Sequence, residues 1–229
     1  VTLLAHSLSF GLTPAVRGGL PYPFSVRLNR PAPAGGLVAS LASSSPNFPV
    51  PATVAFAAGD SVKDVTVATQ GVSPGIAVVL TVTFGAFTAK NSVNLGPAQL
   101  SQVSYAPLFT NGPGEVVTAT ITLTGTAPAS GLPVTIENLS SQLAAAPSVI
   151  TIPGDSSTAQ FSVTTLPAVD KTPGPVTLRL RLPDGQELVR SFQASPGVRI
   201  SLVQVAPTTI AAGASVTATV TLIGPAPPG

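Results

Sequence analysis

The sequence predicts an all-β fold built from antiparallel β-sandwiches in tandem. Three observations predict it. Short stretches of alternating apolar and polar residues recur along the chain, 25 prolines and 21 glycines separate them, and one strand-and-corner pattern is written three times. Turn residues spaced about every eight to twelve positions, with β-branched alternation between them, are typical of small sandwich domains.

The repeated pattern is an alternating strand that runs into a corner rich in proline and glycine. It occupies residues 24–36, recurs at 119–131 and begins again at 218–229. Each copy carries a leucine and a proline at corresponding positions: Leu28 and Pro33, Leu123 and Pro128, Leu222 and Pro227. The three leucines are separated by 95 and then 99 residues, and so are the three prolines, which makes chance a poor explanation.

A period near 100 residues is the size of one small β domain. We therefore predict complete sandwiches at 1–97 and 98–197, and the first two strands of an incomplete third repeat at 198–229. The joints Gly96-Pro97-Ala98 and Pro196-Gly197 are short and contain proline, which restricts the backbone and predicts a semi-rigid string of modules. Since the chain stops inside a repeat, we expect it to be a piece of a longer polypeptide.

Each complete repeat is expected to hold seven strands. In the first repeat they are expected at 3–10, 22–29, 37–43, 51–57, 62–68, 76–84 and 87–95. In the second repeat they are expected at 100–105, 115–124, 132–138, 148–152, 158–164, 175–182 and 186–194.

The second strand of the second repeat shows the two-residue period best. Its apolar residues are expected to face the core: Val117, Ala119, Ile121 and Leu123. The threonines between them are expected to face solvent, as on a half-buried antiparallel strand. The third repeat copies this pattern from Val216 to Leu222.

Two kinds of turn support the assignment. Gly59-Asp60-Ser61 and Gly154-Asp155-Ser156 are interpreted as the same turn in the two repeats. Phe84-Gly85-Ala86-Phe87 suits a two-residue hairpin with glycine first. The turn at 182–186 predicts a closing hairpin that pairs Leu180 with Leu188 and Arg181 with Glu187. The same register aims Arg190 inward near Leu178, for which the sequence offers no reason.

The elements therefore follow a fixed order. An alternating strand leads into the corner 31–36, a turn follows at Gly59-Asp60, Thr69 closes the fifth strand, and a hairpin ends at Gly96-Pro97. This order resembles the tandem immunoglobulin-like repeats of bacterial secreted and surface-attached proteins, over both complete repeats and the start of the third. The resemblance implies immunoglobulin-like sandwiches that serve as spacers, stalks, fibre subunits, adhesin shafts or accessory modules. Such repeats share no catalytic residue, so it implies none here.

Composition excludes several function classes. Charged residues make up 8% of the chain, and ten Lys and Arg stand against eight Asp and Glu without a basic run, which argues against nucleic-acid binding. The absence of cysteine excludes disulfides, thiolate metal sites and thiol nucleophiles. No apolar stretch approaches the roughly 18 residues that span a bilayer. So few charges favour a surface covered by neighbours or partners.

Few side chains invite a chemical role. His6 is the only histidine, and a catalytic triad would need a nucleophile and an orienting group beside it. Asp60 and Asp155 are the carboxylates considered for a calcium site at a domain joint, although no calcium-loop motif is present. Paired carboxylates for glycoside hydrolysis are neither excluded nor favoured by spacing. We predict no catalytic, cofactor-binding or metal-binding residue.

Three further patterns have an ordinary structural explanation. The threonine rows suit solvent-facing β positions better than an ice- or crystal-binding array. Arg179, Arg181 and Arg190 are expected on a solvated strand face rather than in a binding patch. Asn138-Leu139-Ser140 is a glycosylation sequon that arises commonly by chance.

The first functional hypothesis is a non-catalytic structural repeat protein of an extracellular or cell-surface fibre, stalk or assembly, whose partners are other copies or neighbouring repeats. Because two strands cannot bury a core alone, we expect residues 198–229 to be completed by further residues of the same polypeptide or by strand addition from another chain. The alternative is an adhesin or a module that binds carbohydrate or protein. It requires an exposed aromatic cluster, and only Tyr22, Tyr105 and nine phenylalanines are available.

Overall fold

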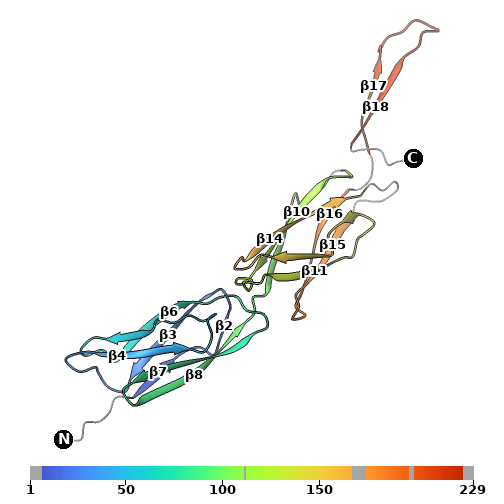
Figure 1. Ribbon diagram of the computed structural model, residues 1–229. Helices are drawn as coiled ribbons and strands as arrows, with labels where there is room; N and C mark the ends of the chain where they lie inside the picture. Colours follow the sequence, from blue (N-terminus) through green and yellow to red (C-terminus); the bar gives the residue numbers. More distant parts are fainter. Residues whose placement is uncertain (1–6, 111, 167–173, 196–198, 224–229) are drawn as a thin grey trace, which may run out of the picture. The chain divides into compact units, whose positions relative to one another are not determined.

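The computed structural model describes residues 7–110, 112–166, 174–195 and 199–223. In this part of the chain the structure is all-β, with 18 strands and no helix (Figure 1). It divides into two compact units. The first contains residues 7–99 with the segments 123–132 and 152–157, and the second contains residues 100–122, 133–151 and the described residues from 158 onward.

The first sandwich is formed by eight strands: β1 Leu8–Gly11, β2 Ala15–Arg17, β3 Pro21–Leu28, β4 Leu37–Ser43, β5 Thr53–Phe56, β6 Val62–Ala68, β7 Ile76–Phe84 and β8 Phe87–Gly96. One sheet has the order β1-β3-β6 and the other β2-β8-β7-β4-β5. All pairs are antiparallel except β2 with β8. The chain therefore crosses from one sheet to the other between β1 and β2.

The second sandwich also has eight strands: β9 Leu100–Ala106, β10 Val116–Leu123, β11 Leu132–Asn138, β12 Ala144–Ala145, β13 Val149–Ile152, β14 Thr158–Thr165, β15 Gly174–Arg181 and β16 Glu187–Ala194. Its sheets have the orders β12-β14-β10-β9 and β13-β11-β15-β16. The chain repeats the crossover after β9, because Phe109 forms a parallel bridge with Gln193 of β16. Both sandwiches have the immunoglobulin-like arrangement.

The predicted strands lie close to the observed ones, but the count of seven is not confirmed. Strands β2 and β12 were not predicted, because with three and two residues they are too short to show a two-residue period. The first strand, predicted to begin at residue 3, is observed from Leu8, and its earlier residues lie outside the described part.

The core of each sandwich lies between its two sheets, where the alternation predicted it. In the second sandwich the predicted inward residues of β10 are 0% to 5% exposed: Val117, Ala119, Ile121 and Leu123. In the first sandwich Tyr22 packs edge-on against Phe48 with their ring centroids 5.3 Å apart. Burial of such side chains stabilises each sandwich by about 1.5–3 kcal/mol per residue.

A buried threonine hydroxyl anchors the same corner in both sandwiches. Thr69 Oγ1 donates to the Leu20 carbonyl at 2.6 Å. Thr165 Oγ1 donates to the Gly112 carbonyl at 2.9 Å and accepts from the Glu115 N–H at 3.0 Å. Both threonines are below 7% exposed. The buried backbone groups at the start of β3 and before β10 are satisfied in this way.

The turn interpretation needs a correction by one residue. In the first sandwich the N–H of Gly59 donates to the Ala32 carbonyl, and the corresponding bond in the second sandwich runs from Asp155 to Ala127. Asp155 therefore corresponds to Gly59 rather than to Asp60, and both have positive φ, of 60° and 89°. The two turns have the same length, because the Asp60 N–H donates to the Ala57 carbonyl and the Ser156 N–H to the Pro153 carbonyl, and the letters Gly-Asp-Ser stand one place earlier in the second turn.

Both predicted hairpins are confirmed. Phe84 pairs with Phe87 around Gly85, whose φ is 55°. In the closing hairpin of the second sandwich, the predicted partners Leu180–Leu188, Arg181–Glu187 and Leu178–Arg190 are all observed. The Arg190 side chain nevertheless stays exposed, because β16 is the last strand in its sheet, and its Nη1 donates to the Val189 carbonyl at 2.8 Å.

The segment that follows β8 is held by hydrogen bonds. Arg17 Nη1 donates to the Pro97 carbonyl at 3.1 Å. Two residues later the backbone of Gln99 bonds twice to Thr124, once through the threonine side chain. The segment predicted as a joint is thus tied to Arg17 of β2 and to Thr124, both of which belong to the first unit.

Candidate interaction surfaces

The described part of the chain ends in a two-stranded sheet of β17 Arg199–Ala206 and β18 Thr217–Ile223 (Figure 1). Val203 pairs with Val220 and Val205 with Ala218, so these side chains share one face, which we call the hairpin face. A register shift between Ile200 and Leu202 returns Ile200 to the same face, opposite Leu222. The other face carries Leu202, Gln204 and the threonines of β18.

The hairpin face has the same pattern as a buried face of the second sandwich. Leu100, Val103 and Tyr105 of β9 correspond to Ile200, Val203 and Val205, and the inward residues of β10 correspond to those from Val216 to Leu222. The β9 residues are 5% to 8% exposed. Their counterparts on β17 are 45% to 63% exposed, and Val216, Val220 and Leu222 are 38% to 52% exposed. The pattern that forms a core in one place is open to solvent in the other.

The hairpin also has free edges. In the second sandwich β10 pairs with β9 on one side and with β14 on the other. Among the described residues β18 pairs with β17 alone. The backbone groups along its second edge therefore form a template for another strand.

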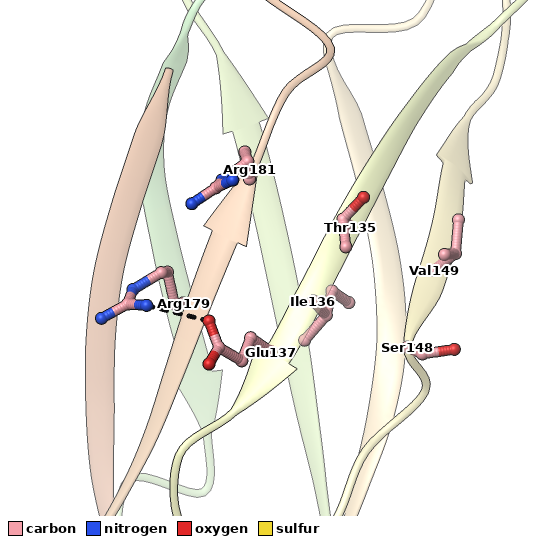
Figure 2. Close-up of a pocket in the computed structure, with 7 residues that line it drawn as sticks. All are labelled: Thr135, Ile136, Glu137, Ser148, Val149, Arg179 and Arg181. Carbon is pink, nitrogen blue, oxygen red and sulfur yellow. Dashed lines mark hydrogen bonds and ion pairs between the residues drawn. The ribbon is translucent and has the colours of Figure 1, made fainter. Parts of the chain in front are cut away.

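A second surface lies on the outer side of the sheet β13-β11-β15-β16, where a shallow depression of about 410 Å³ is lined by seven residues (Figure 2). Arg179 Nη1 donates to Glu137 Oε2 at 2.9 Å, the dashed line in Figure 2. Arg179 Nε lies 3.7 Å from Glu187 Oε2, and Arg181 also pairs with Glu187. The four side chains form a ladder of alternating charge across three strands, which we call the charge ladder.

The structure brings together only some of the residues singled out from the sequence. Arg179 and Arg181 share the ladder, while Arg190 lies apart from it on the neighbouring strand, so the three do not form one basic patch. Each ladder arginine is paired with a carboxylate, which was predicted for Arg181 but not for Arg179. The pairing of Arg179 with Glu137 of β11 could not be predicted from the sequence, because β11 and β15 are far apart in the chain.

The carboxylates considered for a metal do not gather. Within the described ranges no three of His, Cys, Asp and Glu lie close enough to hold an ion. Asp60 Oδ2 accepts the Ala57 N–H at 2.9 Å, which is a turn contact. His6 lies outside the described residues.

Two other candidates have structural roles. The side-chain amide of Asn138 donates to the Ala144 carbonyl at 2.8 Å, and its oxygen accepts the Ser140 N–H, so the sequon forms a turn. Tyr105 packs against Phe192 with ring centroids 5.0 Å apart, and its hydroxyl donates to the Arg190 carbonyl at 3.3 Å. Burial raises the pKa of Tyr105 to about 12, partly opposed by the nearby Arg190 charge.

The threonine rows face outward as predicted. On β10 the threonines lie beside the polar residues of β14, and Gln160 Nε2 donates to Thr120 Oγ1 at 3.2 Å. Most aromatic side chains are buried. Among the described residues the large exposed aromatics are Phe87 at 40% in the first unit and Phe109 at 63% in the second. In the described part of the chain there is no helix long and apolar enough to cross a membrane.

The comparisons add similar structures but no family. No known protein family and no curated protein matches the chain. An ICAM-5 D1–D4 ectodomain fragment aligns at 19% identity with a TM-score of 0.32, over 94% of this chain and 60% of that one. The titin domains z1z2 in complex with telethonin align at 12% identity and a TM-score of 0.33, over 86% and 99%. Escherichia coli alpha-2-macroglobulin activated by porcine elastase aligns at 10% identity with a TM-score of 0.32, over 87% of this chain and 23% of that one. The fold assignment therefore rests on the strand order observed in this chain.

Proposed function

We propose that this chain is a non-catalytic structural module of a bacterial extracellular fibre, stalk or surface assembly, and that its hairpin 199–223 is completed by strand addition from another copy. One observation carries the proposal. The hairpin repeats the apolar pattern of β9 and β10, yet its residues are 38% to 63% exposed where their counterparts are 0% to 8% exposed.

Exposure of this extent is costly for a two-stranded sheet. A lone hairpin is marginally stable in water, and it needs a third strand or a facing layer to bury its apolar side. In the second sandwich the third strand is β14, which runs antiparallel to β10 and aligns Val163 with Val117. An added strand is therefore expected to run antiparallel along β18, with backbone hydrogen bonds supplying affinity and alternate side chains covering the hairpin face.

The rest of the molecule suits a mechanical role. The first sandwich has a continuous core, and the segment after β8 is tied by the Arg17–Pro97 and Gln99–Thr124 hydrogen bonds. A short joint containing proline is expected to limit bending between successive modules. In this architecture the successive modules are the repeats 1–97, 98–197 and 198–229, and none of them carries a catalytic residue, a cofactor or a metal.

The binding alternative receives less support. Recognition of carbohydrate by a loop surface uses clustered aromatic rings. Here Tyr22, Phe48 and Phe192 are 2% exposed or less. We therefore propose the structural role alone.

Substitution on the two faces of the hairpin tests this function. Val220→Asp places a charge on the hairpin face, and Thr219→Asp places the same charge on the opposite face. We expect the first variant, like deletion of residues 198–229, to abolish concentration-dependent assembly seen by light scattering and electron microscopy. The second variant is expected to assemble. Assembly that persists without residues 198–229, or a wild-type chain that never assembles, would contradict the proposal.

A further inference from the structure

The outer side of the sheet β13-β11-β15-β16 combines charges and exposed apolar side chains in a regular order. The charge ladder occupies the two central strands and β16. Val189 of β16 is 42% exposed and Val149 of β13 is 54% exposed, one on each outer strand. We call this outer side of the sheet the ladder face.

The register fixes where each charge stands. Arg179 lies opposite Glu137 on β11 and opposite Val189 on β16. In the next row Arg181 lies opposite Thr135 on β11 and Glu187 on β16. The ladder thus has its positive charges on β15 and its negative charges on the strands to either side.

The charges remain accessible to a partner. The side chains of Arg181 and Glu137 are 55% and 56% exposed, and those of Arg179 and Glu187 are 35% and 38% exposed. Surface ion pairs of this kind contribute little to the stability of the fold that carries them. Across an interface they favour one partner and one register over others.

This arrangement is complementary to itself in one orientation. A two-fold axis parallel to the strands, passing between β11 and β15, exchanges those two strands between facing copies. It sets Arg179 of each copy over Glu137 of the other. The same operation brings the β16 edge of each copy over the β13 edge of the other.

The other in-plane orientation is unfavourable. A two-fold axis across the strands would set Arg179 over Arg181 of the second copy, and like charges facing each other at an interface oppose association. The residue pattern therefore selects the first axis over the second. An interface of this kind is isologous, because both copies contribute the same patch.

We propose that the ladder face pairs two copies of this chain side by side about the axis parallel to its strands. The occupant is a second copy because Arg179 and Glu137, which lie opposite each other on β15 and β11, each meet the opposite charge when the face is matched with itself in this way. The pairing does not depend on the hairpin, whose face and edges are separate. It adds a lateral contact to the strand addition proposed above.

A charge-reversal experiment tests the pairing directly. Arg179→Glu gives a ladder face with negative charge at both central positions, and Glu137→Arg gives one with positive charge at both. Each variant alone is expected to dissociate at least about tenfold more readily than the wild type in sedimentation velocity, because its two-fold partner repeats the same charge. An equimolar mixture is expected to form heterodimers, since every central charge then faces its opposite.

The mixture separates this mechanism from a change in folding. Each variant loses its internal Arg179–Glu137 pair, and mixing two chains cannot restore an internal pair. Recovery in the mixture therefore requires contact between copies through these residues. All samples carry Val220→Asp, so hairpin assembly contributes nothing, and Lys90→Glu in the first sandwich is the matched charge control, expected to associate like the parent.

The outcome is decisive in either direction. A parent chain that stays monomeric, or a mixture that associates no more than its separate variants, overturns the proposal. A cross-link gives an independent check: the chain has no cysteine, so Thr135→Cys provides a single reactive thiol next to the proposed axis. A bismaleimide of about 10 Å, the usual spacing of facing sheets, is expected to link two copies, and added salt to reduce the yield.

Discussion

The clearest test of the hairpin compares one double substitution at two equivalent places. Val103 and Val117 lie in the core of the second sandwich and are 5% and 0% exposed. Val203 and Val216 occupy the corresponding places in the hairpin and are 54% and 45% exposed. Replacing either pair by alanine makes the same chemical change in a buried and in an open copy of one pattern.

The two double substitutions are expected to change different quantities, namely the free energy of unfolding of the sandwich and the strength of assembly through the hairpin. Each Val→Ala change removes about two methylene equivalents, at about 0.8 kcal/mol each when buried. In the sandwich the double variant is therefore expected to lower the free energy of unfolding by at least about 3 kcal/mol, with more lost to the cavity. In the hairpin Val203 and Val216 are each about half exposed, so a partner that covers them buries the equivalent of about one valine side chain. Replacing both by alanine is therefore expected to cost about 1.6 kcal/mol of assembly free energy, which is roughly a 15-fold weaker association.

Two assays separate the effects. Urea unfolding followed by circular dichroism measures the sandwich, where the hairpin variant is expected to stay within about 0.5 kcal/mol of the wild type. Light scattering against concentration measures assembly, where the hairpin variant is expected to need roughly 15-fold more protein. If V203A/V216A destabilised the sandwich as V103A/V117A does, or left assembly unchanged, the hairpin face would not be an interface.

Three further predictions concern the fold. Asp155→Gly is expected to raise the free energy of unfolding by about 0.5–1 kcal/mol, because φ is positive at residue 155. Gly59→Ala at the equivalent place is expected to lower it by about 1 kcal/mol. Thermal melts that shifted in the opposite directions would refute the corrected turn alignment. Thr165→Val is expected to cost about 1–3 kcal/mol in urea unfolding, since it leaves buried backbone groups unpaired, and Thr165→Ser should recover most of this. Stability is expected to fall as pH rises from 10 to 12, because the Tyr105 hydroxyl ionises in the unfolded chain before it does in the folded one; Tyr105→Phe should flatten that part of the curve, and an unaltered slope would argue against the shift.

The sequence predicted much of the fold because the signals are local. A two-residue period places Val117 and Ile121 inward whatever the rest of the chain does, and glycine at Gly85 selects a tight hairpin from a few neighbouring residues alone. Errors arose where the signal was short or shifted. Strands of two or three residues show no period, and the letters Gly-Asp-Ser stand one place earlier in the second turn, so aligning the letters misaligned the backbone.

The candidate surfaces were predicted less completely, because they depend on which strands lie side by side. Arg181 and Glu187 are close in sequence, so their pairing followed from one turn. Arg179 and Glu137 are brought together by the pairing of β15 with β11, which no local pattern specifies. Phe109 was not singled out, although the crossover after β9 places it on the ladder side of β16 beside Gln193.

The amino-acid order alone determined the alternation, the turns and the repeat, since each depends on the preferences of residues near one another in the chain. Only the tertiary structure decided what those patterns do. The same alternating valines are core in β9 and β10, where the sheet of β11, β15 and β16 lies over them, and are open in β17 and β18. Burial is a property of what faces a strand, and the strand's own sequence does not contain it.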